Sequence, residues 1–195
     1  MRSRRILIVQ GHPDNSMVHL CHELGASYAM GAESAGHAIR WVHVGALEFP
    51  LLRNPREWRE APVPEALRQV QQDIAWAEHL VLVFPLWLGA MPALLKGFLE
   101  QVARPGFAFG EGADVFSTRP LKGRTTRVVV TMGMPAFVYR WFYSAHSVRA
   151  LERNVLAFIG IAPVGRNLFG GVEKVGPEVR ERWQADMHRL GRSGR

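Results

Sequence analysis

The sequence contains very little cysteine: Cys21 is the only one among 195 residues. An intrachain disulfide is therefore impossible, and a cysteine-based metal cluster cannot form within one chain. This composition suits a reducing compartment, because extracellular domains of modest size often depend on disulfides. We therefore expect a cytoplasmic protein without a metal site.

Long apolar runs are also missing. The basic N-terminus is followed by the apolar run 6–9, which ends at Gln10 and is too short for the core of a signal peptide. The longest apolar stretch, 80–95, is interrupted by two prolines and a glycine and falls short of the roughly 20 residues that a membrane helix needs. The sequence thus predicts neither a signal peptide nor a membrane span.

Acidic residues are outnumbered, with 17 Asp and Glu against 24 Lys and Arg, which gives a formal net charge of +7. Such an excess favours anionic partners, which include nucleic acids, membrane surfaces and phosphate-bearing ligands. The basic residues are spread along the chain rather than gathered in a block, with denser stretches at 2–5, 119–127 and 180–195. We interpret them mainly as solvated surface charge that assists a phosphate-bearing cofactor, and we expect no nucleic-acid partner.

Hydrophobic residues, by contrast, make up 48% of the chain and include ten Phe and six Trp. This is enough for a sizeable core, and the length predicts a single domain over residues 1–195. Hydrophobic periodicity predicts strands at 5–10, 37–44, 79–84, 126–132 and 163–169. It predicts helices at 17–32 with Ser16 as the N-cap, at 64–77 and 91–102 with a proline in the first turn, at 144–158 and at 177–190. The ranges 47–64 and 107–122 are expected to be loops.

This alternation of strands and helices predicts the α/β class, with a parallel sheet covered by helices on both faces. In such sheets ligands bind beyond the carboxyl ends of the strands, near the point where the strand order reverses. Three predicted loops qualify by position, at 11–16, 85–92 and 131–135. These loops are where we look for chemistry.

The loop 11–16 joins a glycine and a polar run to the start of a helix, where free backbone N–H groups and the helix dipole favour a phosphate. His12 and Ser16 add side-chain donors. The alternative is a plain turn whose serine only caps the helix. The loop lacks the spacing of a GxGxxG fingerprint and of a P-loop, which argues against a dinucleotide Rossmann fold and an NTPase.

The loop 85–92 follows the most hydrophobic strand and has no polar side chain other than the indole of Trp87. It offers backbone donors and acceptors beside an aromatic wall, which suits a planar amphipathic ring such as isoalloxazine. The alternative is a hydrophobic loop buried in a dimer interface, and the two interpretations are compatible.

The loop 131–135 contains residues that allow the backbone to approach a ring edge closely, Gly133 above all. Beyond it, Tyr139, Tyr143 and His146 supply the phenol and imidazole groups of this region. Taken alone, each of these three side chains is more often structural than catalytic.

Four stretches carry a family resemblance: RILIVQGHPDNS, IAWAEHLVLVFPLWLGAMPALLKGFLEQV, GFAFG and RVVVTMG. The chain resembles the NAD(P)H:quinone oxidoreductase group of flavodoxin-like proteins, which includes the ancillary flavoproteins of glutathione-gated potassium efflux systems. The resemblance implies a flavodoxin-like fold, a five-stranded parallel sheet in the order 2-1-3-4-5, and a homodimer with FMN or FAD at the subunit interface. NAD(P)H would be the co-substrate.

The same resemblance implies roles for individual residues. His12, Ser16 and Met17 would bind the flavin's phosphate region, while Pro85, Leu86, Trp87 and Leu88 would line its ring. Thr131, Met132 and Gly133 would face the polar edge of the ring, where Tyr139 and His146 would act as catalytic residues that stabilise the reduced flavin. The substrate pocket would be formed by Met134 together with Phe107 and Phe109, the two phenylalanines being contributed across the dimer.

The third loop departs from the family pattern, since many relatives carry a second glycine where this chain has Met134. Pro135 also removes an N–H donor, and residues 137–143 are unusually aromatic. We expect a narrower and more apolar pocket, and hence an altered substrate range. Both flavins stay open with FMN slightly preferred, and the surplus of arginine slightly favours NADPH over NADH.

The leading hypothesis is hydride transfer from NAD(P)H to the flavin and from there to a quinone-like small-molecule acceptor. A second hypothesis is a regulatory ancillary subunit that binds a membrane potassium efflux transporter. A third is a one-electron carrier like the true flavodoxins, against which the positive charge argues because those proteins are usually acidic.

Overall fold

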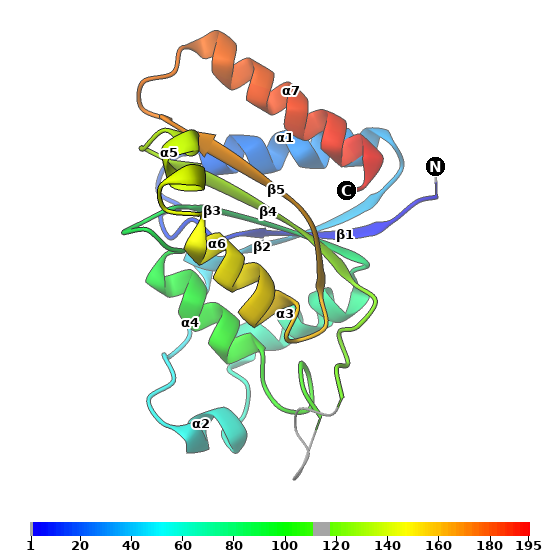
Figure 1. Ribbon diagram of the computed structural model, residues 1–195. Helices are drawn as coiled ribbons and strands as arrows, with labels where there is room; N and C mark the ends of the chain where they lie inside the picture. The colour runs from blue at the N-terminus through cyan, green and yellow to red at the C-terminus, as the bar shows by residue number, and fades with distance from the viewer. Residues whose placement is uncertain (1, 111–117) are drawn as a thin grey trace.

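The computed structural model describes residues 2–110 and 118–195, so the middle of the loop expected at 107–122 lies outside the described residues. Its centre is a five-stranded parallel sheet in the order β2-β1-β3-β4-β5 (Figure 1). The strands are β1 (Arg5–Gln10), β2 (Ala38–His43), β3 (His79–Pro85), β4 (Thr125–Met132) and β5 (Ala162–Gly170). The strand order expected from the sequence is confirmed.

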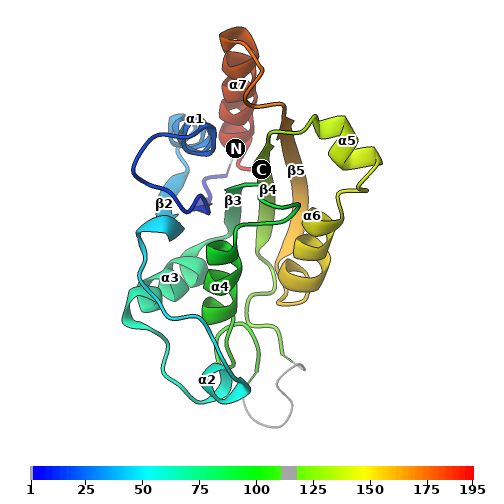
Figure 2. The same ribbon diagram turned by 90° about the vertical axis from the view of Figure 1, so that its left-hand side faces the viewer.

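Helices cover both faces of this sheet (Figures 1 and 2). One face carries α1 (Leu20–Ser34) and α7 (Pro177–Ser193), which lie against each other. The other face carries α3 (Glu65–Trp76), α4 (Ala93–Val102) and α6 (His146–Ala150), the last of which continues as the π-helical turn η3 (Leu151–Leu156). A short 3-10 turn, η1 (Val44–Ala46), follows β2.

The two faces enclose two hydrophobic cores, and the period of two along a strand assigns each side chain to one of them. In β1, Ile6 and Ile8 belong to the core under α1 and α7, whereas Leu7 and Val9 belong to the core on the opposite face. All seven residues of β3 are buried, as expected for the central strand of a parallel sheet. Both faces of the sheet are therefore covered by hydrophobic cores, which leaves the ends of the strands to form a ligand site.

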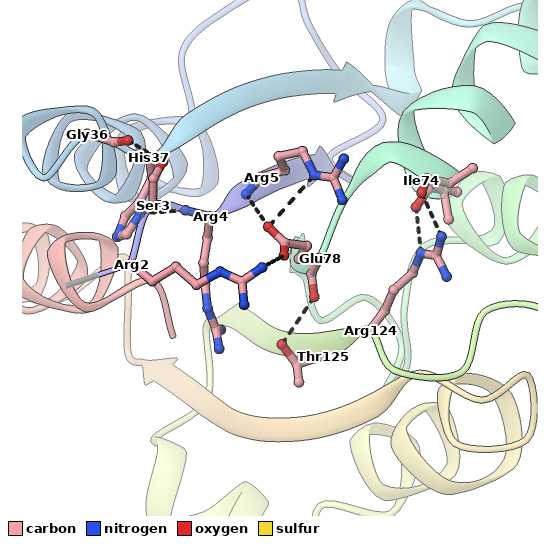
Figure 3. A network of polar contacts seen from close by, with 11 residues as sticks. Arg2, Ser3, Arg4, Arg5, Gly36, His37, Ile74, Glu78, Arg124 and Thr125 are labelled. Atoms are coloured by element: carbon pink, nitrogen blue, oxygen red, sulfur yellow. Dashed lines mark hydrogen bonds and ion pairs between the residues drawn. The ribbon is translucent and has the colours of Figure 1, made fainter.

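The amino ends of the strands are tied together by polar contacts around Glu78 (Figure 3). The Glu78 carboxylate accepts a hydrogen bond from the Arg5 N–H at 3.1 Å and pairs with Arg2 at 3.5 Å. The Glu78 carbonyl accepts one from the Thr125 N–H at 3.1 Å. These bonds join β1, β3 and β4 at the end of the sheet that faces away from the three loops.

The helix α1 begins three residues later than the sequence predicts, and Ser16 is not its N-cap. His19 is the N-cap, because the Asp14 carboxylate accepts hydrogen bonds from both the N–H and the hydroxyl of Ser16 and so removes Ser16 from the helix end. Pro64 and Pro92 likewise precede α3 and α4 as N-caps instead of lying in their first turns.

Two short helices lie where the sequence suggested none. They are α2 (Pro55–Arg59), inside the expected loop 47–64, and α5 (Ala136–Trp141), inside the aromatic segment after β4. Helices of one or two turns depend on tertiary contacts, so periodicity does not reveal them. The expected helix 144–158 is divided into α6 and η3, and η3 contains the buried Glu152 paired with Arg166. Across the described ranges, no helix is long and apolar enough to cross a membrane.

Candidate functional site

A cavity of about 480 Å³ opens at the carboxyl ends of the central strands. It is bounded by the loops that follow β1, β3 and β4, and also by the segment after β5. Its lining residues are His12, Asp14, His19, Leu20, Cys21, Pro85, Leu86, Trp87, Thr131, Met132, Gly133, Val172 and Glu173. Figure 2 looks onto this end of the sheet. His12 of the β1–α1 loop and Trp87 of the β3–α4 loop meet there, with 5.6 Å between their ring centroids. This is the position that the strand-end rule indicates.

His12 forms one wall of the cavity and is only 6% exposed. Its ring stacks on His19 with 3.8 Å between centroids, and its Nδ1 atom accepts a hydrogen bond from the Asp14 N–H at 3.1 Å. Burial, and secondarily the proximity of His19, lowers the pKa of His12. Nδ1 also lies 3.1 Å from the Asp14 carbonyl oxygen, so the tautomer of the ring decides whether Nδ1 accepts from the Asp14 N–H or donates to this carbonyl.

Asp14 organises the rest of this loop. Its carboxylate accepts hydrogen bonds from the Ser16 N–H at 2.8 Å and the Ser16 hydroxyl at 2.6 Å, and it lies 2.7 Å from Nε2 of His19. The contacts to Ser16, with His19 as the next cause, hold the pKa of Asp14 well below its usual range. Within the described residues, the N–H groups of Asn15, Met17 and Val18 have no hydrogen-bond acceptor. The loop therefore presents several donors and one competing carboxylate.

The second loop is held in a tight turn. Trp87 and Ala90 exchange two backbone hydrogen bonds of 2.9 and 3.0 Å, and the Leu86 N–H donates to the Thr131 carbonyl at 2.7 Å. Leu88 and Gly89, at the tip, both have positive φ, which is uncommon for a leucine. Leu88 is fully exposed and does not line the cavity, whereas the ring of Trp87 lies edge-on to His12.

The third loop brings two free backbone donors to the cavity. In the described part of the chain, the N–H groups of Gly133 and Met134 donate to no protein acceptor. The Thr131 hydroxyl lies 3.0 Å from the Cys21 sulfur. Burial raises the pKa of Cys21 to about 12, so this thiol is neutral and inert as a nucleophile at ordinary pH.

The segment after β5 completes the cavity. The Gly171 N–H donates to the Met134 carbonyl at 2.9 Å and the Val172 N–H to the Met132 carbonyl at 3.2 Å. These bonds place Glu173 over Gly133, where a Cβ atom added to the glycine would lie 3.7 Å from a carboxylate oxygen. A carboxylate thus stands beside the free donors of the third loop.

Seven of the residues singled out from the sequence meet in this cavity: His12, Pro85, Leu86, Trp87, Thr131, Met132 and Gly133. Ser16, Met17 and Leu88 are exposed outside its lining. Tyr139 is buried with its hydroxyl 2.5 Å from the Ser147 hydroxyl, and His146 is exposed at the start of α6. These positions do not test the roles expected for the residues.

The residues expected to form a substrate pocket do not come together within one chain. Phe107 lines an apolar cleft beneath α4, while Phe109 packs against Trp58 with 5.8 Å between ring centroids. Met134 belongs to the third loop and joins neither group. Any shared pocket would have to combine two chains.

The sequence reasoning missed several lining residues, notably Asp14, His19, Cys21, Val172 and Glu173. Glu173 and Val172 follow the fifth strand, so the rule that selected the other three loops could have selected this one. Cys21 and His19 carried no such signal, because their approach depends on where α1 begins.

A parallel sheet in the order 2-1-3-4-5, with a ligand-sized cavity where the strand order reverses, defines a ligand-binding protein of the flavodoxin-like class. A family model described by its flavodoxin-like fold matches residues 4–192. The chain therefore belongs to this family, and the resemblance drawn from its motifs is confirmed.

Two curated relatives illustrate the similarity. A ribosyldihydronicotinamide dehydrogenase-like protein of Penicillium crustosum is 31% identical over 181 residues, an alignment that covers 78% of this chain and 64% of that protein. A glutathione-regulated potassium-efflux system ancillary protein of Escherichia coli is 42% identical over 66 residues, with 33% of each chain covered. The chain spans less than two thirds of the length of the curated relatives it matches.

Solved structures share the fold at lower identity. The NAD(P)H:quinone oxidoreductase from Methanothermobacter marburgensis has a TM-score of 0.79 and 22% identity, with 98% of this chain and 97% of that chain covered. An FMN-dependent NADH-azoreductase from Bacillus anthracis in complex with FMN has a TM-score of 0.70 and 17% identity, with 95% and 97% covered.

Proposed function

We propose that this protein is a flavin-dependent NAD(P)H oxidoreductase that passes a hydride to a quinone-like small-molecule acceptor. The observation that carries the proposal is the convergence of three strand-end loops on one cavity that combines apolar walls with free backbone donors. The names of the relatives point to the same activity. The chemistry itself belongs to the flavin, which accepts the hydride when bound, while the protein supplies position and electrostatics.

The residues present fit a flavin. Pro85, Leu86 and Trp87 provide an apolar wall for the ring, and the free N–H groups of Gly133 and Met134 can donate to its polar edge. The absence of a side chain at Gly133 leaves this backbone accessible, although Glu173 stands nearby.

The phosphate end fits as well, with one condition. His12 and the free N–H groups of Met17 and its neighbours can donate to a phosphate, as can Ser16 once its present bonds are released. Asp14 now occupies the Ser16 donors, so its carboxylate has to turn away when a phosphate binds. We propose FMN over FAD, a preference supported by the FMN complex among the similar folds.

We propose that Tyr139 and His146 act on the flavin ring in different ways. Because Tyr139 is buried and bonded to Ser147, it would act by holding α6, from which His146 projects. His146 would then be the group that stabilises negative charge at the ring edge. Tyr139 is thus a positioning residue in this proposal.

We also propose a homodimer. The tip residue Leu88 is fully exposed in a strained backbone conformation, and Met17 and Val18 are 61% and 71% exposed on the neighbouring loop. Exposed apolar side chains gathered beside a cavity favour coverage by a second chain. That arrangement could bring Phe107 and Phe109 of one subunit toward Met134 of the other to form the acceptor pocket.

The test begins with the cofactor. The purified protein should be yellow, and heat should release FMN that chromatography distinguishes from FAD. The reconstituted protein should oxidise NADPH or NADH only when a simple quinone is present. His12→Ala should lower flavin content at least severalfold, whereas His188→Ala, on the far helix α7, should not. A colourless protein that takes up neither flavin would refute the proposal.

A second candidate function is the regulatory ancillary subunit of a potassium efflux transporter. It is favoured by the 42% identity to the Escherichia coli ancillary protein over 66 residues. It predicts that this chain raises potassium efflux through a co-expressed antiporter encoded beside its gene. Quinone reduction without any effect on efflux would exclude it.

A further inference from the structure

A second cavity, of about 540 Å³, has Ala136 in its lining, three residues after Gly133 of the candidate flavin site. It is formed by α5, α6 and the edge strand β5, and the two cavities share no lining residue. Figure 2 shows these three elements together at one side of the sheet. Its lining residues are Ala136, Phe137, Arg140, Trp141, Ala145, Arg149, Arg166 and Leu168.

The charge of this cavity is unbalanced. Arg166 is neutralised by Glu152, whose carboxylate lies 2.6 Å from its guanidinium. Within the described residues, neither Arg140 nor Arg149 forms an ion pair or a hydrogen bond, although the Glu152 carboxylate also interacts electrostatically with Arg149. All the titratable groups that line the cavity are arginines, so its field is positive.

Two aromatic side chains stand beside these arginines. Phe137 and Trp141 are 67% and 79% exposed, although both are large and apolar. They lie one turn apart on α5 and therefore occupy the same side of that helix. Exposed aromatic faces next to unpaired guanidinium groups are typical of recognition surfaces.

The cavity is also held rigidly. The Tyr139 hydroxyl bonds to Ser147 and accepts a hydrogen bond from the Val148 N–H at 3.4 Å, and the Ala145 N–H donates to the Tyr139 carbonyl at 3.0 Å. These bonds fix α5 against α6, although Ser144 and Ala145 both adopt the positive φ that disfavours such residues. The backbone at Ser144 and Ala145 therefore stays in this strained conformation, and Arg140 and Arg149 keep fixed positions on α5 and α6.

We propose that the cavity between α5, α6 and β5 binds a small anion that carries a flat apolar ring. Arg140 and Arg149 hold its carboxylate or phosphate through their planar donors. Phe137 and Trp141 contact the ring, and the volume lies within the range of ligand pockets. A second copy of the chain fits less well, because a two-fold contact through this patch would set like charges against each other.

Isothermal titration calorimetry on the full-length protein tests this with 2-naphthoate and 2′-AMP, which represent an aromatic carboxylate and a phosphorylated nucleoside. The uncharged 2-naphthamide and adenosine are the matched ligands. We expect at least one anion to bind about tenfold or more tightly than its uncharged counterpart. The stronger anion identifies the source of the ligand. Equal binding of both members in each pair, or no binding at all, overturns the proposal.

Variants locate the site. Arg140→Gln with Arg149→Gln should weaken anion binding about tenfold or more, and Arg149→Lys should weaken it less because the charge is kept. The matched control is Arg153→Gln, an exposed arginine on η3 outside the cavity, which should change binding less than about twofold. Flavin content should stay unchanged in all of them, so failure here is distinct from failure of the proposed function.

Two results would contradict the assignment. The first is anion binding that survives in the double variant while its thermal unfolding matches the wild type. The second is a change of molecular mass in sedimentation on substitution, without any change in anion affinity, which would make this patch a protein interface.

Discussion

Oδ2 of Asp14 lies 2.7 Å from Nε2 of His19, within the loop that leads from β1 into α1. The same carboxylate also holds the N–H and the hydroxyl of Ser16. An anionic group of the protein thus occupies donors that a bound phosphate could use. Asp14 behaves as an internal competitor at the phosphate end of the proposed site.

Replacing Asp14 with Asn should therefore tighten FMN binding about fivefold, because the repulsion between carboxylate and phosphate is removed. Riboflavin, which lacks the phosphate, should bind equally to both proteins. Quenching of flavin fluorescence measures both affinities. Asp186→Asn, at a half-buried aspartate of α7 that pairs with Arg189, is the matched control. Equal gains for FMN and riboflavin, or weaker FMN binding, would contradict the competition.

His79 should make the protein less stable in acid. Burial, with help from Arg4 and Arg127, lowers the pKa of this fully buried side chain to about 3. As the pH falls below about 6.5, the unfolded chain takes up a proton at His79 while the native protein does not, so the free energy of unfolding decreases. Between pH 7.5 and pH 5 the protonation of His79 in the unfolded chain lowers the free energy of unfolding by up to about 2 kcal/mol, since each pH unit below about 6.5 contributes about 1.4 kcal/mol.

Urea unfolding at both pH values checks this prediction. His79→Gln should reduce the loss of stability between pH 7.5 and pH 5, whatever its stability at neutral pH. The prediction fails if the wild type and His79→Gln lose stability in parallel.

The contact between α1 and α7 depends on two glycines. A Cβ atom at Gly31 would lie 2.0 Å from the His188 carbonyl oxygen, and one at Gly191 would lie 2.0 Å from the Tyr28 carbonyl oxygen. Gly31→Ala should lower the free energy of unfolding by about 2 kcal/mol, since the obstacle is backbone and the helices must separate. Met30→Ala, at the exposed neighbouring position, should change it by less than about 0.5 kcal/mol. Chemical denaturation measures both.

Tyr139 offers a test of positioning against catalysis. Tyr139→Phe removes the hydroxyl that joins Ser147 and the Val148 N–H, so it should destabilise the protein by about 1 kcal/mol. Tyr143→Phe should be close to neutral, because the Tyr143 ring is half exposed. If Tyr139 positions His146, the pH profile of quinone reduction should shift in Tyr139→Phe. A loss of stability with an unchanged profile would make its role purely structural.

Cys21 should be unreactive in the native protein. The side chain is 1% exposed, and its raised pKa leaves almost no thiolate at neutral pH. We expect no labelling by iodoacetamide over hours, and complete labelling in guanidinium chloride. As Cys21 is the sole cysteine, the denatured protein is its own control. Rapid native labelling would show that α1 opens at its start.

Local patterns predicted a large part of this fold. The runs at 6–9 and 80–84 identify β1 and β3 because both faces of a central parallel strand are buried, and burial leaves a continuous apolar signal. The loops after these strands, with that after β4, were identified from position alone, and seven of their residues do line one cavity. The fold class and the strand order agree with the resemblance.

The predictions that were wrong concern places where the local sequence allows more than one structure. Contacts with residues elsewhere in the fold decide between these structures. Ser16 has the chemistry of an N-cap, but Asp14 engages it and His19 takes its place. The helix α5 has only six residues, which is too few for hydrophobic periodicity to predict, and it packs on α6 and β5.

The sequence by itself determined the buried strands and the composition of the first three loops, because these depend on hydrophobic periodicity and on residues close together in the chain. The strand order was implied by the family resemblance and not by periodicity. The tertiary structure alone decided that Glu173 faces Gly133, that Cys21 lies beside Thr131, and that Arg140, Arg149 and Arg166 share a cavity. Those relationships depend on strand pairing and helix packing across long separations. No local pattern encodes such distances.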